Sequence, residues 1–217
     1  MASNKKGIQT KEYIYKITKN LFYEFGYNKT TLSLISKEAD VPIGLIPYHF
    51  KNKDNILKMV YDDFLREIDK CINKHSIDTK NNSILRHAIV SRIYYQIILE
   101  NNNNKRVYTE VLRKKSNYIL LHNSIGSRYV SYLDDYNITL TKEEFESNLY
   151  CDFGARREFF LHLMNEDIQM PIQDVVTFVN GIIPRLLKID QNTVDDILSY
   201  SLECFNKIDY SDITFLK

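Results

Sequence analysis

Apolar residues recur at the spacing of an α-helix along almost the whole chain of 217 residues. One such face, with intervals of three and four residues, consists of Ile14, Ile17, Leu21 and Phe25. A broader stripe extends from Ile56 to Ile68. No segment of useful length shows the two-residue period of a β-strand, and six glycines and four prolines are few for an all-β protein. The sequence therefore predicts an all-α protein of about nine to ten helices.

Cap residues place the ends of the first helices. We expect the first helix to begin at an N-cap Thr10 and to end at Gly26, since glycine readily adopts the backbone conformation of a C′ residue. Tyr27 can then pack on Phe22. A second, short helix is expected after Thr30 or Thr31, and Asp40 lies where the chain must turn.

A third helix is expected within residues 42–50, and a long fourth helix begins at about Lys53. Six more helices are predicted over 84–100, 105–116, 118–134, 142–165, 172–188 and 193–207. Asn101 to Asn104 is expected to interrupt the chain between the first two of these. Thr141 and Glu144 have the spacing of a capping box, and Asn192 or Thr193 can cap the last helix.

Positive charge is concentrated near the start of the chain. Residues 1–53 contain nine lysines and four acidic residues, a net charge of +5. The whole chain has a net charge of +1, so the remainder carries −4. A basic N-terminal part on an acidic body suggests contact with a polyanion. The alternative is a lysine-rich face that is simply solvated.

Several function classes lack their usual signatures. Cys71, Cys151 and Cys204 are far apart and show no ligand spacing, so we expect no disulfide framework and no metal. The first residues lack an apolar signal segment and no run approaches 18 apolar residues, which predicts a cytoplasmic protein without a membrane partner. No catalytic or dinucleotide-binding motif occurs, so we expect neither enzyme activity nor a cofactor.

Three short helices joined by tight turns predict a helix-turn-helix unit. Residues 10–58 resemble the DNA-binding region of TetR-family transcriptional regulators. The first helix ends in Phe25-Gly26-Tyr27, and Ile35-Ser36-Lys37-Glu38-Ala39 follows Thr30-Thr31. The most specific match is the run Tyr48-His49-Phe50-Lys51-Asn52-Lys53. The resemblance implies a DNA-binding domain over residues 1–52 and a helical ligand-binding and dimerisation domain over 53–217.

The resemblance also implies which side chains meet double-stranded DNA. Hydroxyl groups at the start of the second helix can approach a phosphate, Tyr48 can donate to a phosphate, and His49 can contact a phosphate or a base. A structural hydrogen bond is the alternative for His49. Lys51 and Lys53 would supply positive charge. The candidate DNA-binding residues are Lys29, Thr30, Thr31, Ile43, Gly44, Leu45, Pro47, Tyr48, His49, Lys51 and Lys53.

The expected recognition helix departs from the family pattern. Residues 42–47 read Pro-Ile-Gly-Leu-Ile-Pro and carry no side-chain hydrogen-bonding group. Pro47 is tolerated only near a helix start, so we predict a short helix that begins near Gly44. Hydrogen-bonded base reading is then largely unavailable, and Ile43, Leu45 and Pro47 would instead touch thymine methyl groups. Our hypothesis is an A/T-rich inverted-repeat operator.

The C-terminal part is rich in tyrosine and phenylalanine, which suits a pocket for a small, largely apolar or aromatic effector. Candidate ligand-binding residues are Tyr94, Tyr95, Tyr108, Tyr118, Tyr129, Tyr132, Phe153 and Arg156. Ordinary core packing is the alternative for each aromatic residue, and a surface salt bridge is the alternative to an anion contact for Arg156.

The resemblance implies a homodimer that pairs through residues 142–165 and 172–188. Gly181 could allow two helices to approach closely, or it could mark a bend before Pro184. The resulting function is a repressor whose ligand shifts the fourth helix and releases DNA. The alternatives are a helical protein-interaction module and a DNA-binding protein that needs no ligand.

Overall fold

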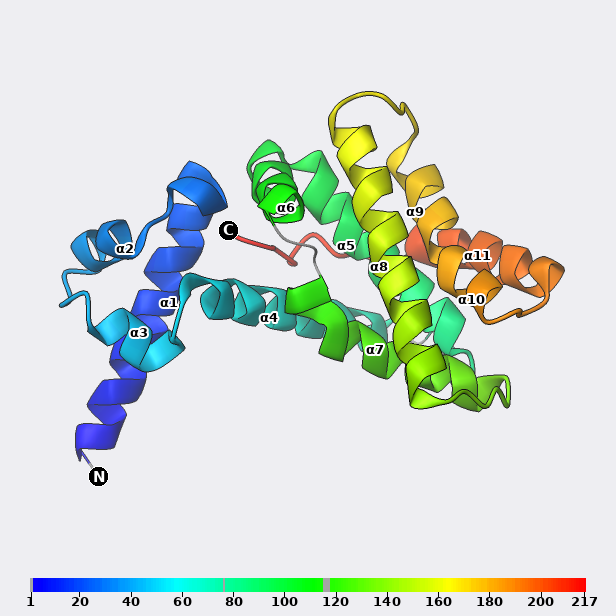
Figure 1. Ribbon diagram of the computed structural model, residues 1–217, viewed down its shortest axis with the longest axis horizontal. Helices are drawn as coiled ribbons and strands as arrows, with labels where there is room; N and C mark the ends of the chain where they lie inside the picture. Colours follow the sequence, from blue (N-terminus) through cyan, green and yellow to red (C-terminus); the bar gives the residue numbers. More distant parts are fainter. Residues whose placement is uncertain (1, 76, 115–117) are drawn as a thin grey trace.

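The computed structural model describes residues 2–75, 77–114 and 118–217, with side chains from residue 7 onward. The described residues form helices and turns without any strand, which confirms the all-α prediction. Figure 1 shows a small head, a helix α4 that leads away from it, and a larger helical body. The head contains α1 (Ala2–Lys29), α2 (Leu32–Glu38) and α3 (Leu45–Phe50). The other helices are α4 (Lys53–Lys74), α5 (Ser83–Glu100), α6 (Asn102–Lys114), α7 (Tyr118–Asp135), α8 (Lys142–Met164), α9 (Ile172–Asn180), α10 (Ile182–Leu186) and α11 (Gln191–Phe205).

The first helix ends as predicted but begins earlier. Gly26 has φ 83° and breaks the regular helix, and the Phe22 and Tyr27 rings lie 5.9 Å apart. Thr10, however, lies inside α1 and is not its N-cap. The helix extends to Ala2 because no proline interrupts the preceding residues and Gly7 alone does not break it.

The head has a core of its own, against which the first turns of α4 also pack. Ile35 of α2, Ile46 and Phe50 of α3, and Ile56 of α4 are all buried. Thr31 caps α2 by accepting a hydrogen bond from the backbone N–H of Leu34 at 3.1 Å. The inward side chains fix the orientation of α3 relative to α1 and α4.

Three boundaries in the body differ from the sequence predictions. Only Asn101, and not the whole run Asn101 to Asn104, separates α5 from α6. Its Oδ1 accepts hydrogen bonds from the backbone N–H groups of Asn103 and Asn104 and so caps α6. The last helix is capped by Asp190, not by Asn192 or Thr193. The helix predicted over 172–188 is divided at Gly181 into α9 and α10. Residues 115 and 116 of the helix predicted over 105–116 lie outside the described residues, whereas the capping box at Thr141 is confirmed.

Helix α5 forms the centre of the body and packs against α4, α6, α7, α9 and α11. Even the charged Arg92 is fully buried there. Its burial is tolerated because the guanidinium donates to Ser201 Oγ at 2.8 Å, to Thr177 Oγ1 at 2.9 Å and to the Leu198 carbonyl at 2.9 Å. Burial lowers the pKa of Arg92 to about 10, so the guanidinium still carries its charge at neutral pH. Within the described residues, no helix is long and apolar enough to cross a membrane.

Candidate nucleic-acid interface and candidate ligand pocket

Recognition helix α3 is short, as the sequence predicts. It has six residues and begins after Gly44. Its start is stabilised by backbone hydrogen bonds between residues three positions apart: Leu45 N donates to Pro42 O at 2.9 Å, and Ile46 N donates to Ile43 O at 3.2 Å. The missing N–H of Pro47 therefore falls in the first turn, where it leaves little of the helix unpaired.

The outer face of α3 is apolar. Ile43 and Tyr48 have exposed fractions of 50% and 79%, and Gly44 and Pro47 are also exposed. Leu45 is half-buried. Residues 42–47 offer no side-chain hydrogen-bonding group on this face, as the sequence indicates, and Tyr48 is the first residue that does. The geometry suits methyl contacts and shape-dependent reading of DNA.

Polar groups lie at the edges of this apolar face. His49 is half-buried, and its ring lies 4.9 Å from that of Tyr48 and 6.2 Å from that of Phe50. Lys29 and Thr31, which flank the start of α2, and Lys51, which follows α3, are exposed. Contacts of these side chains with DNA stay predictions.

Two of the predicted DNA contacts point inward instead. Thr30 is fully buried, and its hydroxyl donates to the Gly26 carbonyl at 2.7 Å. Lys53 Nζ donates to the carbonyls of Tyr27 and Thr30 at 2.6 and 2.8 Å and lies 4.0 Å from the Tyr27 ring centre. Burial lowers the pKa of Lys53. Both side chains donate to backbone carbonyls where α1 breaks. We call this segment, Gly26 to Thr30, the joint of the head, and we assign both side chains to it and not to a phosphate contact.

Helix α6 of the body also forms hydrogen bonds with the backbone at the end of α1. Arg106 donates to the Tyr23 and Glu24 carbonyls at 2.7 and 2.9 Å, and Glu110 accepts from the Asn28 N–H at 2.7 Å. A Cβ atom at Gly26 would lie only 2.7 Å from Glu110. The sequence analysis missed this contact because the partners are about 80 residues apart and neither side carries a recognisable motif.

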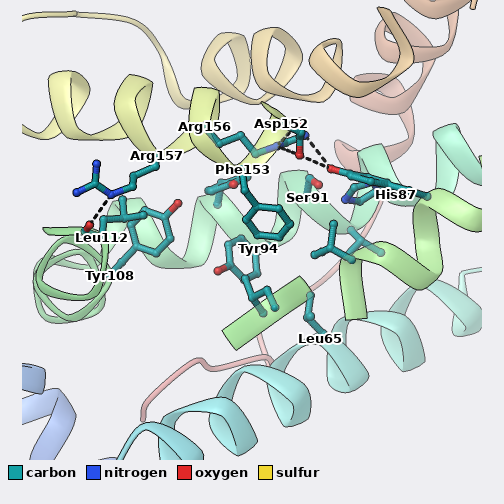
Figure 2. A pocket seen from close by; sticks show the side chains of 15 residues that line it. Leu65, His87, Ser91, Tyr94, Tyr108, Leu112, Asp152, Phe153, Arg156 and Arg157 are labelled. Atoms are coloured by element: carbon teal, nitrogen blue, oxygen red, sulfur yellow. Dashed lines mark hydrogen bonds and ion pairs between the residues drawn. The ribbon is translucent and has the colours of Figure 1, made fainter. Parts of the chain in front are cut away.

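A buried cavity of about 50 Å³ lies in the body between α4, α5, α6, α7 and α8 (Figure 2). Six of the eight predicted ligand-binding residues line it, namely Tyr94, Tyr95, Tyr108, Tyr129, Phe153 and Arg156. Leu65, His87, Ser91 and Asp152, which the sequence analysis did not single out, also line it. The spacing of Asp152 and Arg156, four residues apart in a helix, is the signal that could have found the acidic partner.

Tyr118 and Tyr132 do not line the cavity. The Tyr118 ring lies 4.9 Å from the rings of His122 and Tyr150. Tyr132 lies one layer further out, with its hydroxyl 2.6 Å from His87 Nδ1. For these two residues, packing within the body replaces the predicted ligand contact.

One wall of the cavity holds a buried ion pair. Asp152 is fully buried, Arg156 Nε lies 2.9 Å from both of its carboxylate oxygens, and the Tyr129 hydroxyl donates to Oδ2 at 2.6 Å. Burial by itself lowers the pKa of Arg156, but the neighbouring Asp152 carboxylate raises it well above its ordinary value. Of the two alternatives left open for Arg156, an anion contact and a surface salt bridge, the structure favours a salt bridge, but a buried one.

Comparison with known proteins agrees with the geometry of the head. Residues 14–60, which run from within α1 into the first turns of α4, match the profile of the family described as bacterial regulatory proteins, tetR family. Residues 14–60 therefore form a DNA-binding domain of the TetR family of transcriptional regulators. The match places this regulator among DNA-binding proteins and not among enzymes.

Two relatives extend the similarity beyond this domain or repeat it. The chain is 22% identical over 156 residues to the probable HTH-type transcriptional regulator YttP of Bacillus subtilis (strain 168), over 72% of this chain and 70% of YttP. It is 34% identical over 61 residues to the uncharacterized HTH-type transcriptional regulator YhgD of the same organism, over 28% of this chain and 32% of YhgD. The solved structure of RolR in complex with the ligand resorcinol shares the fold with a TM-score of 0.61 at 15% identity, over 90% of this chain and 96% of RolR.

Proposed function

We propose that this regulator is a repressor that binds an A/T-rich inverted-repeat operator as a homodimer. A small, largely apolar or aromatic ligand enters the cavity of the body and releases the DNA. Residues 1–52 form the DNA-binding domain, and residues 53–217 form the ligand-binding and dimerisation domain.

The observation that carries this proposal is that two helices each contact both the cavity and the head. Helix α4 contributes Leu65 to the cavity, while its first turn receives a hydrogen bond from the Tyr27 hydroxyl to Asp54. Helix α6 contributes Tyr108 and Leu112 to the cavity and holds the end of α1 through Arg106 and Glu110. A ligand that displaces cavity side chains therefore acts on both helices that hold the head.

Helix α6 thus adds to the route expected from the sequence, which involved the fourth helix alone. Because α6 holds the backbone next to Gly26, a small shift of α6 changes the angle between α1 and α2. In a dimer, this change alters the spacing of the two recognition helices, which must be about 34–36 Å to lie in successive major grooves.

The proposed dimer face is the outer side of α8 with α9 and α10. Within the predicted dimerisation ranges 142–165 and 172–188, apolar residues such as Leu149, Phe160 and Val179 are buried within the protomer and are not available to a partner. Tyr150 and Phe178 are instead exposed. One turn after Tyr150 on α8, Gly154 and Ala155 are small and exposed, which permits close approach of a second helix.

The RolR complex supports a small-molecule ligand, since RolR has this fold and was solved with resorcinol. A cavity of about 50 Å³ holds a few water molecules, whereas an apolar cavity of about 150 Å³ holds benzene. Ligand binding to this chain therefore requires side chains to move, and that movement is what α4 and α6 would transmit.

The test begins with selection of bound fragments from host genomic DNA, followed by titration of the selected duplex. We expect two chains per duplex and a symmetric, A/T-rich motif. Compounds related to the products of neighbouring genes are then added, and one of them should weaken binding. A monomer on a single half-site, or a G-rich motif contacted through hydrogen bonds, would contradict the proposal, and binding that no compound alters would favour the ligand-independent alternative.

A further inference from the structure

The cavity is charged but its charges cancel. Asp152 and Arg156 form a direct ion pair in its wall, and Figure 2 shows both residues along the upper side of the pocket. His87 also lines the cavity. Burial, together with Arg128 and Arg156, lowers the pKa of His87 well below its ordinary value, so this imidazole is neutral.

The neighbouring Arg157 does not change this balance inside the cavity. Its Nε donates to the Leu112 carbonyl at 3.0 Å, and Nη1 lies 3.5 Å from Glu158. Figure 2 shows Arg157 extending toward α6 and away from Asp152. Of the two consecutive arginines, only Arg156 belongs to the buried constellation.

Hydrogen-bonding capacity nevertheless remains in the cavity wall. The Tyr94 hydroxyl is buried beside the Tyr61 hydroxyl, and neither of the two forms a hydrogen bond of normal geometry within the described residues. Ser91 adds a hydroxyl from the next turn of α5. Arg156 uses Nε for the carboxylate, while its terminal nitrogens have looser partners: the Tyr129 hydroxyl lies 3.4 Å from Nη2, and the Tyr95 hydroxyl is also a neighbour. A buried polar group without a partner costs free energy, which a ligand that pairs with it restores.

We infer that the pocket selects an uncharged, planar molecule that carries both a hydrogen-bond donor and an acceptor, and that it rejects carboxylates and amines of the same shape. The inference rests on the proposed role of this cavity as the effector site. A charged ligand would add an uncompensated charge to a buried site that Asp152 and Arg156 already balance. An uncharged amide or phenol can donate to Asp152 and accept from Arg156 or Tyr94, with its ring against Phe153 and the tyrosines.

Three probes of nearly identical shape test this selectivity: benzamide, which is uncharged, benzoate, which is an anion, and benzamidine, which is a cation. Binding of each to the full chain is measured by calorimetry at neutral pH, without DNA. We expect benzamide to bind the unaltered protein at least about tenfold more tightly than either charged probe. Equal affinities, a preference for a charged probe, or no binding of benzamide at millimolar concentration would overturn the inference.

Substitutions of Asp152 and Arg156 should then change which of the three probes binds most tightly. Asp152→Asn keeps the shape and leaves Arg156 unbalanced, so benzoate should become the preferred probe. The double variant Asp152→Asn with Arg156→Gln restores neutrality and should again prefer benzamide. Asp134→Asn, an exposed position at the end of α7, is the matched control and should bind as the unaltered protein does.

This cycle separates charge selection from damage to the fold. General damage would weaken all three probes together, whereas charge selection exchanges their order in one variant and restores it in the next. If Asp152→Asn does not fold, the double variant decides the question, because it must still prefer benzamide. A variant series in which the order of the probes never changes would contradict the inference.

Failure here is distinct from failure of the proposed function. If the protein binds its operator and is released by a charged effector, the function stands and the selectivity is wrong. If benzamide binds as described but no occupant of the cavity alters DNA binding, the selectivity stands and the regulatory role is wrong.

Discussion

The outer face of α3 and the wall of the body cavity reverse the usual distribution of polar groups. The segment that would meet DNA, a polyanion in water, exposes Ile43 just before α3 and Pro47 within it. The cavity of the body has the ion pair of Asp152 and Arg156 in its wall. An apolar surface against DNA reads methyl groups and shape, and a polar group in a dry cavity reads hydrogen bonding and charge. Each region is thus arranged for selectivity, at the expense of affinity in the head and of stability in the body.

The largest expected effect comes from removing one partner of the buried ion pair. Asp152→Ala leaves Arg156 without a counterion and should destabilise the fold by about 3–5 kcal/mol. Replacing both residues together, Asp152→Leu with Arg156→Met, should cost much less, because no charge then remains buried. Urea unfolding of the two variants measures the difference. A double variant as unstable as the single one would show that the pair is needed for stability and not for selectivity.

In the head, Leu45→Ser should change sequence preference by about 1–3 kcal/mol at one base-pair position, with a smaller change in overall affinity. The reason is that a hydroxyl replaces a methyl contact while the surrounding phosphate contacts are kept. Competition with duplexes varied at single positions measures this effect. A uniform loss of affinity for every duplex would indicate that Leu45 supports the fold of α3 and does not read bases.

Acid should weaken the body through His87. Its pKa is lowered in the folded state, so the unfolded chain binds a proton first as the pH falls below about 6.5. The free energy of unfolding should then drop by up to about 1.4 kcal/mol per pH unit below that value, until the folded-state pKa is reached. His87→Gln should flatten this dependence in urea unfolding between neutral and mildly acidic pH.

The smallest effects distinguish two lysines in the head. Lys51 is exposed, so Lys51→Ala should reduce the slope of log affinity against log salt by about 0.9 for one lost phosphate contact. Lys53 is held by the carbonyls of Tyr27 and Thr30, so Lys53→Met should lower DNA affinity by loosening the joint without changing the slope. Equal changes of slope for the two variants would return Lys53 to the DNA surface.

Local signals in the sequence predicted most of the head. Gly26, Thr31 and the position of Pro47 each follow from backbone preferences of a few neighbouring residues, and each is confirmed. Thr30 and Lys53 were assigned by position to DNA, and their inward orientation depends on which carbonyls the break of α1 leaves unpaired. That information lies in tertiary geometry and not in the spacing of residues.

The body was less predictable for the same reason. Aromatic residues indicated a pocket, and six of the candidates line one, but Tyr118 and Tyr132 have the same character and do not. The contacts between α6 and α1 join residues far apart in the sequence, and no periodicity or motif marks them. The partner of Arg156 followed a helical spacing that the sequence does contain, so this part of the site was accessible to sequence reasoning.

The most direct test of the account is the affinity of the chain for its selected duplex across a range of salt concentrations. If the head grips phosphates around an apolar recognition face, log affinity should fall steeply and linearly with log salt, with two chains bound per duplex. A flat dependence, or no binding even in dilute buffer, would contradict the account.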